Sequence, residues 1–170
     1  MGAGPSKPRV LLLGAPQAGR TTLKEALGDE EFALVDEAAA AADVILYVVD
    51  ATRPAQWTAA EHLLKRLHGV NQRLGRLVPL VVAVNKRDVE GSAPARQVVE
   101  ELAATGDVCA AVGGRVWRVV DCSAKRRDVA ELTRVLRHLA ALPLDPVRIL
   151  APRCQGRGSG PATGASASLP

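Results

Sequence analysis

Short apolar runs alternate along this chain with stretches of helical periodicity, and this alternation constrains the fold more than any other feature. Runs of this length are typical of buried strands, and strands that alternate with helices are typical of a parallel sheet covered on both faces. The expected strands are Val10–Gly14, Phe32–Val35, Val44–Asp50, Val78–Asn85 and Val116–Cys122. The sequence therefore predicts an α/β fold of three layers with a mainly parallel, shortened sheet of about five strands.

Helices are predicted wherever apolar residues recur at helical spacing. One follows the first strand through the residues LKEAL. Three later apolar stripes consist of Trp57, Ala60, Leu64 and Leu67; of Val98, Val99 and Leu102; and of Val129, Leu132, Val135, Leu136 and Leu139.

The domain organisation follows from length and composition. A chain of 170 residues with 48% apolar residues is enough for one domain with a hydrophobic core. Residues 1–8 are expected to form a flexible lead and 9–150 the folded domain. Residues 151–170 are rich in Gly, Pro, Ser and Ala, which predicts a disordered tail.

The charge and the cysteines bear on where the protein is located and on which partners it binds. The three cysteines match no metal-site spacing, and no secretory leader is apparent, so we expect reduced thiols and a cytoplasmic location. A net charge of +4 is weak support for an acidic partner, and aromatics make up only 2%, so we expect no nucleic-acid partner.

A glycine-bounded loop joins the first strand to the first helix, with the sequence GAPQAGRTT. Glycines let the backbone N–H groups face a phosphate, and the helix N-terminus adds a favourable dipole. This is the context of the P-loop pattern G-x-x-x-x-G-K-[ST], although a tight turn without a ligand stays open as an alternative. The predicted phosphate-binding residues are Gly14, Ala18, Gly19, Arg20, Thr21 and Thr22.

One position departs from that pattern, because Arg20 stands where a lysine is usual. A lysine is a compact point charge, whereas a guanidinium is planar and bulkier, so the exchange is not conservative. Thr21 keeps the hydroxyl that would bind Mg²⁺ in such a loop.

Two tetrapeptides, N-K-R-D at 85–88 and C-S-A-K at 122–125, each follow an expected strand. In this order and placement, the three motifs resemble those of Ras-like small GTPases, of the Arf and Rab type, over about residues 9–142. The resemblance implies a P-loop NTPase fold that binds GTP or GDP at the carboxyl ends of its strands. The implied guanine-binding residues are Asn85, Lys86, Asp88, Ser123, Ala124 and Lys125.

The resemblance also implies a role for each of these residues. Asp88 would accept two hydrogen bonds from the guanine edge, which adenine cannot supply. Asn85 would brace the loops, the stems of Lys86 and Lys125 would lie against the faces of the base, and the N–H of Ala124 would meet the guanine oxygen.

The hydrolytic residues of the family are missing between Thr22 and Asn85, an interval much shorter than the family's. Asp36 stands where the family has the aspartate of its D-x-x-G motif and is a second candidate for Mg²⁺, but Ala39 replaces the glycine. No threonine lies between Thr22 and Asp36 to close over a terminal phosphate. We therefore expect weak or absent hydrolysis. The alternative is a pseudo-GTPase that serves as a scaffold for unknown protein partners without nucleotide.

The first six residues, MGAGPS, fit the N-myristoylation pattern at Gly2. One such lipid supports only marginal membrane association. A bare, flexible N-terminus is the other interpretation.

Overall fold

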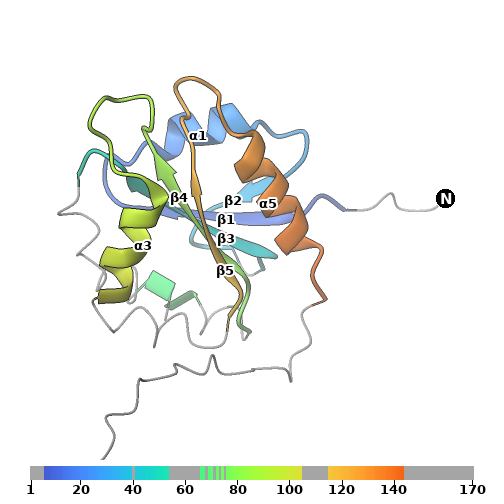
Figure 1. Cartoon of the computed structure of the whole chain (residues 1–170). Helices are drawn as coiled ribbons and strands as arrows, with labels where there is room; N and C mark the ends of the chain where they lie inside the picture. Colours follow the sequence, from blue (N-terminus) through green and yellow to red (C-terminus); the bar gives the residue numbers. More distant parts are fainter. Residues whose placement is uncertain are drawn as a thin grey trace, which may run out of the picture.

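A single parallel sheet forms the centre of the molecule (Figure 1), with the strand order β2-β1-β3-β4-β5. The computed structural model describes residues 6–39, 41–53, 66–67, 69–70, 72, 74, 76–104 and 115–143. All four strand pairings are parallel, which confirms the predicted fold class. The strands are β1 Arg9–Gly14, β2 Ala33–Val35, β3 Val44–Asp50, β4 Leu80–Asn85 and β5 Trp117–Asp121.

Three helices are described: α1 Arg20–Leu27, α3 Ala95–Ala104 and α5 Ala130–Ala140. Figure 1 shows α3 on the left of the sheet and α5 on the right. The stripe predicted for α5 holds, since Leu132, Leu136 and Leu139 are buried. Of the stripe predicted at 57–67, only Leu67 lies within the described residues, and it is buried. Among the residues that the structure describes, no helix is long and apolar enough to cross a membrane.

Two hydrophobic clusters lie on opposite faces of the sheet because successive strand side chains alternate in direction. On β3, Ile45, Tyr47 and Val49 enter the cluster that includes Val98 of α3. Their neighbours in β3 enter the second cluster, with Leu23 of α1 and the buried leucines of α5. Every residue of β3 is buried, so its continuous apolar run reflects a strand covered on both faces.

The strand register brings the carboxyl ends of the strands together. Gly14 pairs with Val48, and Asp50 pairs with Asn85. The loops that follow β1, β3, β4 and β5 therefore leave the sheet at one edge, which is where ligands bind in open parallel sheets.

Candidate nucleotide-binding site

The loop between β1 and α1 has the left-handed turns that a phosphate-binding loop needs. Gly19 has φ of 89° and Gln17 has φ of 61°. A Cβ atom on Gly19 would lie 2.6 Å from Nδ2 of Asn85, so position 19 requires glycine for its φ and for this close approach. The backbone N–H of Ala15 donates to the carbonyl of Val48 at 3.1 Å, which anchors the loop to β3.

Asn85 joins two loops through its side-chain amide. Its Nδ2 donates to the carbonyl of Ala18 at 2.9 Å, and its Oδ1 accepts the N–H of Ala124 at 3.0 Å. The residue is only 2% exposed, so both bonds are shielded from water. The Ala124 N–H is the donor that the family resemblance assigns to the guanine oxygen. A bound guanine would share this N–H with Asn85 or take it over.

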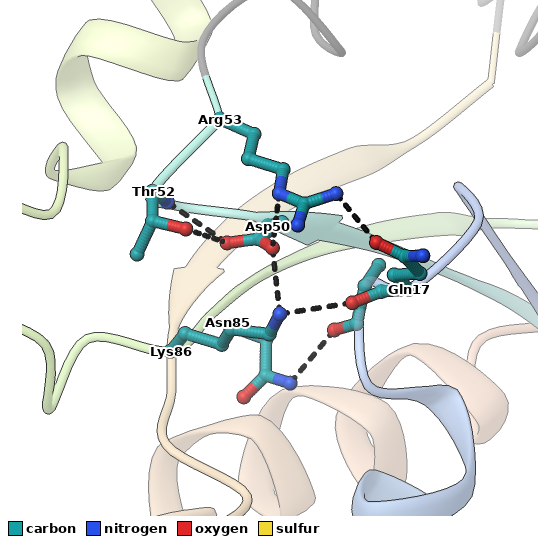
Figure 2. Close-up of polar contacts among 7 residues, drawn as sticks. Gln17, Asp50, Thr52, Arg53, Asn85 and Lys86 are labelled. Carbon is teal, nitrogen blue, oxygen red and sulfur yellow. Dashed lines mark hydrogen bonds and ion pairs between the residues drawn. The ribbon is translucent and has the colours of Figure 1, made fainter.

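Lys86 is held by an acid that sequence analysis left without a role. Figure 2 shows its ammonium between Asp50 and the phosphate loop. The Nζ atom lies 2.6 Å from Oδ2 of Asp50 and donates to the carbonyl of Gln17 at 2.9 Å. Lys86 itself adopts a positive φ of 67°. The strained backbone and the two contacts fix the direction of the lysine stem, which lines the pocket.

Asp50 is completely buried at the end of β3 and is stabilised as a carboxylate. Burial raises its pKa, but hydrogen bonds from Lys86 and from Thr52 outweigh burial, so the pKa of Asp50 lies below its usual value. Thr52 donates to Oδ1 through its backbone N–H at 2.9 Å and through its hydroxyl at 2.6 Å. Arg53 approaches Oδ2 at 3.8 Å and donates to Oε1 of Gln17 at 2.6 Å (Figure 2).

Asp88 is oriented by Ser123. The Ser123 hydroxyl donates to Oδ1 of Asp88 at 2.6 Å, and this bond is the main reason that the pKa of Asp88 lies below its usual value. A carboxylate has about four acceptor positions, so Asp88 keeps capacity for the two N–H donors of a guanine edge. The loop of Ser123 is itself closed, because Ser123 and Asp128 exchange two backbone hydrogen bonds.

A pocket of about 330 Å³ lies between these loops. Seven of the predicted site residues line it, and Val89 is a lining residue that the sequence analysis did not identify. The predicted residues in its wall are Gly19, Thr22, Asn85, Lys86, Asp88, Ala124 and Lys125. Ser123 acts from behind this wall through Asp88. The residues predicted to bind guanine, from two separate loops, and the end of the predicted phosphate loop thus line one cavity.

The residues predicted at the phosphate and metal end are less organised. Arg20, Thr21 and Asp36 are exposed, and Gly14 and Ala18 are buried in the loop. Oδ1 of Asp36 accepts the N–H of Ala38 at 3.0 Å. Within the described residues, no group of three or more His, Cys, Asp or Glu side chains could hold a metal ion. One hydroxyl and one carboxylate still match the way Mg²⁺ is held beside a nucleotide, with phosphates and water as its other ligands.

Sequence reasoning missed Asp50, Gln17 and Arg53. The signal for Asp50 was its place at the end of a buried strand, beside the strand that ends in Asn85. Gln17 and Arg53 carry no motif signal, because their contact depends on how two loops meet. The predicted lipidation site Gly2 lies outside the described residues.

Comparisons with known proteins show which family the sequence resembles. The model of the ADP-ribosylation factor family matches residues 36–140, more than half of the chain, and covers both guanine loops but not the phosphate loop. ADP-ribosylation factor-like protein 3 of Chlamydomonas reinhardtii is 25% identical over 151 residues, and the match covers 69% of this chain and 81% of that protein.

Solved structures of low identity share the fold. The Arl6 BBS3 small GTPase of Trypanosoma brucei, with the bound nucleotide analogue GppNp, superposes with a TM-score of 0.63 at 15% identity, over 79% of this chain and 98% of that one. Apo translation elongation factor SelB of Methanococcus maripaludis gives a TM-score of 0.56 at 17% identity, over 82% and 35% of the two chains. The chain belongs to the ADP-ribosylation factor family of small GTPase-like proteins.

Proposed function

We propose that this chain binds GDP and GTP through the guanine loops and hydrolyses GTP weakly or not at all. The observation that carries the first part is the Ser123–Asp88 hydrogen bond of 2.6 Å at the wall of the pocket. This hydrogen bond orients the ionised carboxylate of Asp88 before a nucleotide binds. Adenine would leave that carboxylate without its two donors, and such unpaired groups are strongly rejected.

Weak hydrolysis is supported by the segment after β2. Ala39 occupies the glycine position of the family motif, and its N–H donates to the carbonyl of Asp36 at 3.1 Å. The Ala39 N–H is therefore already used inside a local turn. The N–H of Ala38 is used in the same turn, because it donates to the Asp36 side chain. The sequence also offers no obvious counterpart of the family's glutamine that orients the attacking water.

Mg²⁺ is assigned to Thr21 and Asp36 as a proposal. When bound, the ion would neutralise charge on the phosphate oxygens. Thr21 belongs to the first turn of α1, and Asp36 follows directly after β2. The second oxygen of Asp36 stays available beside the one that accepts the Ala38 N–H.

The alternative function, a scaffold without nucleotide, is favoured by a different observation. The Lys86 ammonium and the Ala124 N–H are both satisfied by protein groups, through Asp50, Gln17 and Asn85. A site that satisfies its own donors is stable when empty. In that case the N-K-R-D and C-S-A-K motifs would only stabilise the loops, and protein partners would bind to other surfaces of the chain.

The deciding experiment is isothermal titration of the full chain with GDP, GTP and ATP, with and without Mg²⁺, beside single-turnover hydrolysis of GTP. We expect guanine-selective binding that Asp88→Ala abolishes. Asp29→Ala is the matched control, because Asp29 is an exposed acid that follows α1 and lies outside the pocket wall. Robust Mg²⁺-dependent turnover would refute weak hydrolysis. The absence of binding by a folded sample would favour the scaffold.

A further inference from the structure

A second guanidinium reaches the phosphate loop from a distant part of the chain. Nη1 of Arg66 lies 3.3 Å from the carbonyl oxygen of Gly14, the first residue of the loop. The same Nη1 lies 2.8 Å from Oε1 of Glu37. Arg66 belongs to the segment between β3 and β4, and Glu37 follows Asp36. One side chain therefore connects the phosphate loop with the segment that replaces the family's D-x-x-G motif.

Arg20 packs over the same glycine. Its Cγ and Cδ lie 3.0 and 3.1 Å from the position that a Cβ on Gly14 would occupy. The charges of both arginines also act on Tyr47: burial raises the pKa of its hydroxyl, while the positive charges of Arg66 and Arg20 oppose that rise. The Arg20 stem and the Arg66 guanidinium therefore both lie beside Gly14, at the start of the phosphate loop.

The charges at this point favour an anion. Arg20 and Arg66 supply two positive charges, and Glu37 supplies one negative charge in direct contact. The Glu37 side chain is 47% exposed and that of Arg66 is 37% exposed, and ion pairs in such contact with water are weak. A phosphate oxygen, which accepts strong paired hydrogen bonds from a guanidinium, can therefore compete with Glu37 for Arg66.

We propose that Arg66 is a phosphate-binding residue of this site, held by Glu37 when the site is empty and transferred to the phosphate chain of a guanine nucleotide when it is filled. Arg20 and Arg66 then share the task for which the P-loop pattern uses one lysine. This inference rests on the proposed nucleotide binding. It assigns the residue that compensates for the lysine missing at position 20, and it makes Glu37 a competitor of the ligand.

The test is titration of the full chain with guanosine and with GDP, for the wild type, Arg66→Gln and Glu37→Gln. We expect Arg66→Gln to lower the ratio of GDP affinity to guanosine affinity by about tenfold, the effect of one charge-assisted hydrogen bond. We expect Glu37→Gln to raise that ratio by about threefold, because the competing carboxylate is gone. The opposite signs distinguish phosphate recognition from damage to the fold. Arg66→Lys should restore part of the ratio.

The matched control is Arg96→Gln with Glu100→Gln, an exposed ion pair of 2.9 Å within α3, for which the ratio should not change. Unchanged ratios in both Arg66→Gln and Glu37→Gln, with a wild type that prefers GDP to guanosine, would overturn this inference and leave the proposed function intact. A folded wild type that binds neither GDP nor guanosine would overturn both.

Discussion

Replacement of Asp50 by asparagine tests the role of the acid beneath Lys86. The carboxylate is completely buried, while the lysine side chain is 32% exposed. Loss of one partner of a buried ion pair costs about 3–5 kcal/mol, and contact of Lys86 with water lowers this to about 2–3 kcal/mol. Asparagine keeps an acceptor for Thr52 but places an NH₂ group against the ammonium, so it cannot replace the pair.

We therefore expect Asp50→Asn to lower the melting temperature by roughly 5–9 °C. We also expect it to weaken GDP binding by about tenfold, because the stem of Lys86 loses its anchor and must be ordered on binding. Thermal unfolding followed by circular dichroism and titration with GDP measure the two effects separately.

Asp43→Asn is the control for this substitution. Asp43 precedes the same strand, at the end away from the pocket, and pairs with Arg9 at 3.6 Å and Arg76 at 3.4 Å in contact with water. Its loss should cost less than about 1 kcal/mol and leave GDP binding unchanged. The reasoning about Asp50 would be refuted if both variants melted and bound GDP alike.

Three further predictions concern pH, the phosphate loop and the buried thiol. Because the folded pKa of Asp50 is lowered, its stabilisation should be complete above about pH 4 and disappear as pH falls through that lowered value, so acid titration should bring wild type and Asp50→Asn together. Gly19→Ala should reduce stability in urea more than Gly91→Ala, because both glycines have positive φ but only Gly19 faces a neighbour, Asn85; equal losses would argue against the close contact. Burial, with nearby carboxylates, raises the pKa of Cys122 to about 12, so peptide mapping should find it unalkylated at pH 8 until the chain is unfolded, and rapid native labelling would contradict its burial.

The sheet was predictable because its strands are encoded locally. The buried runs around Val48 and Val82 are apolar on both faces, and turn residues end them, so their ends were placed within two residues of those observed. Parallel pairing followed from the helices between the strands. The order of the predicted loops, with the phosphate-binding loop before the two guanine-binding loops, could be recognised because each loop carries a short motif with fixed spacing.

The polar contacts between loops were not predictable in the same way. Arg66 reaches Gly14 and Glu37 across long separations in sequence, and no periodicity marks an arginine as the one that turns inward. Asp50 read as an ordinary acid at a strand end, because its burial depends on Lys86 arriving from the next strand. Such contacts are decided by packing of whole elements, which a single sequence does not specify.

The side chain of Asn85 bears on how fast the site opens rather than on how tightly it binds a ligand. One buried amide closes the phosphate loop onto the guanine loop, so neither loop can move away without breaking its bonds. The two loops should therefore open as one cooperative unit, with the same free energy of opening. In a hydrogen-exchange experiment, the N–H of Ala124 should lose its protection together with the protected N–H groups of the phosphate loop. A nucleotide enclosed between them would leave only when this unit opens, so the Asn85 side chain would contribute to the lifetime of the bound state as well as to the shape of the empty site.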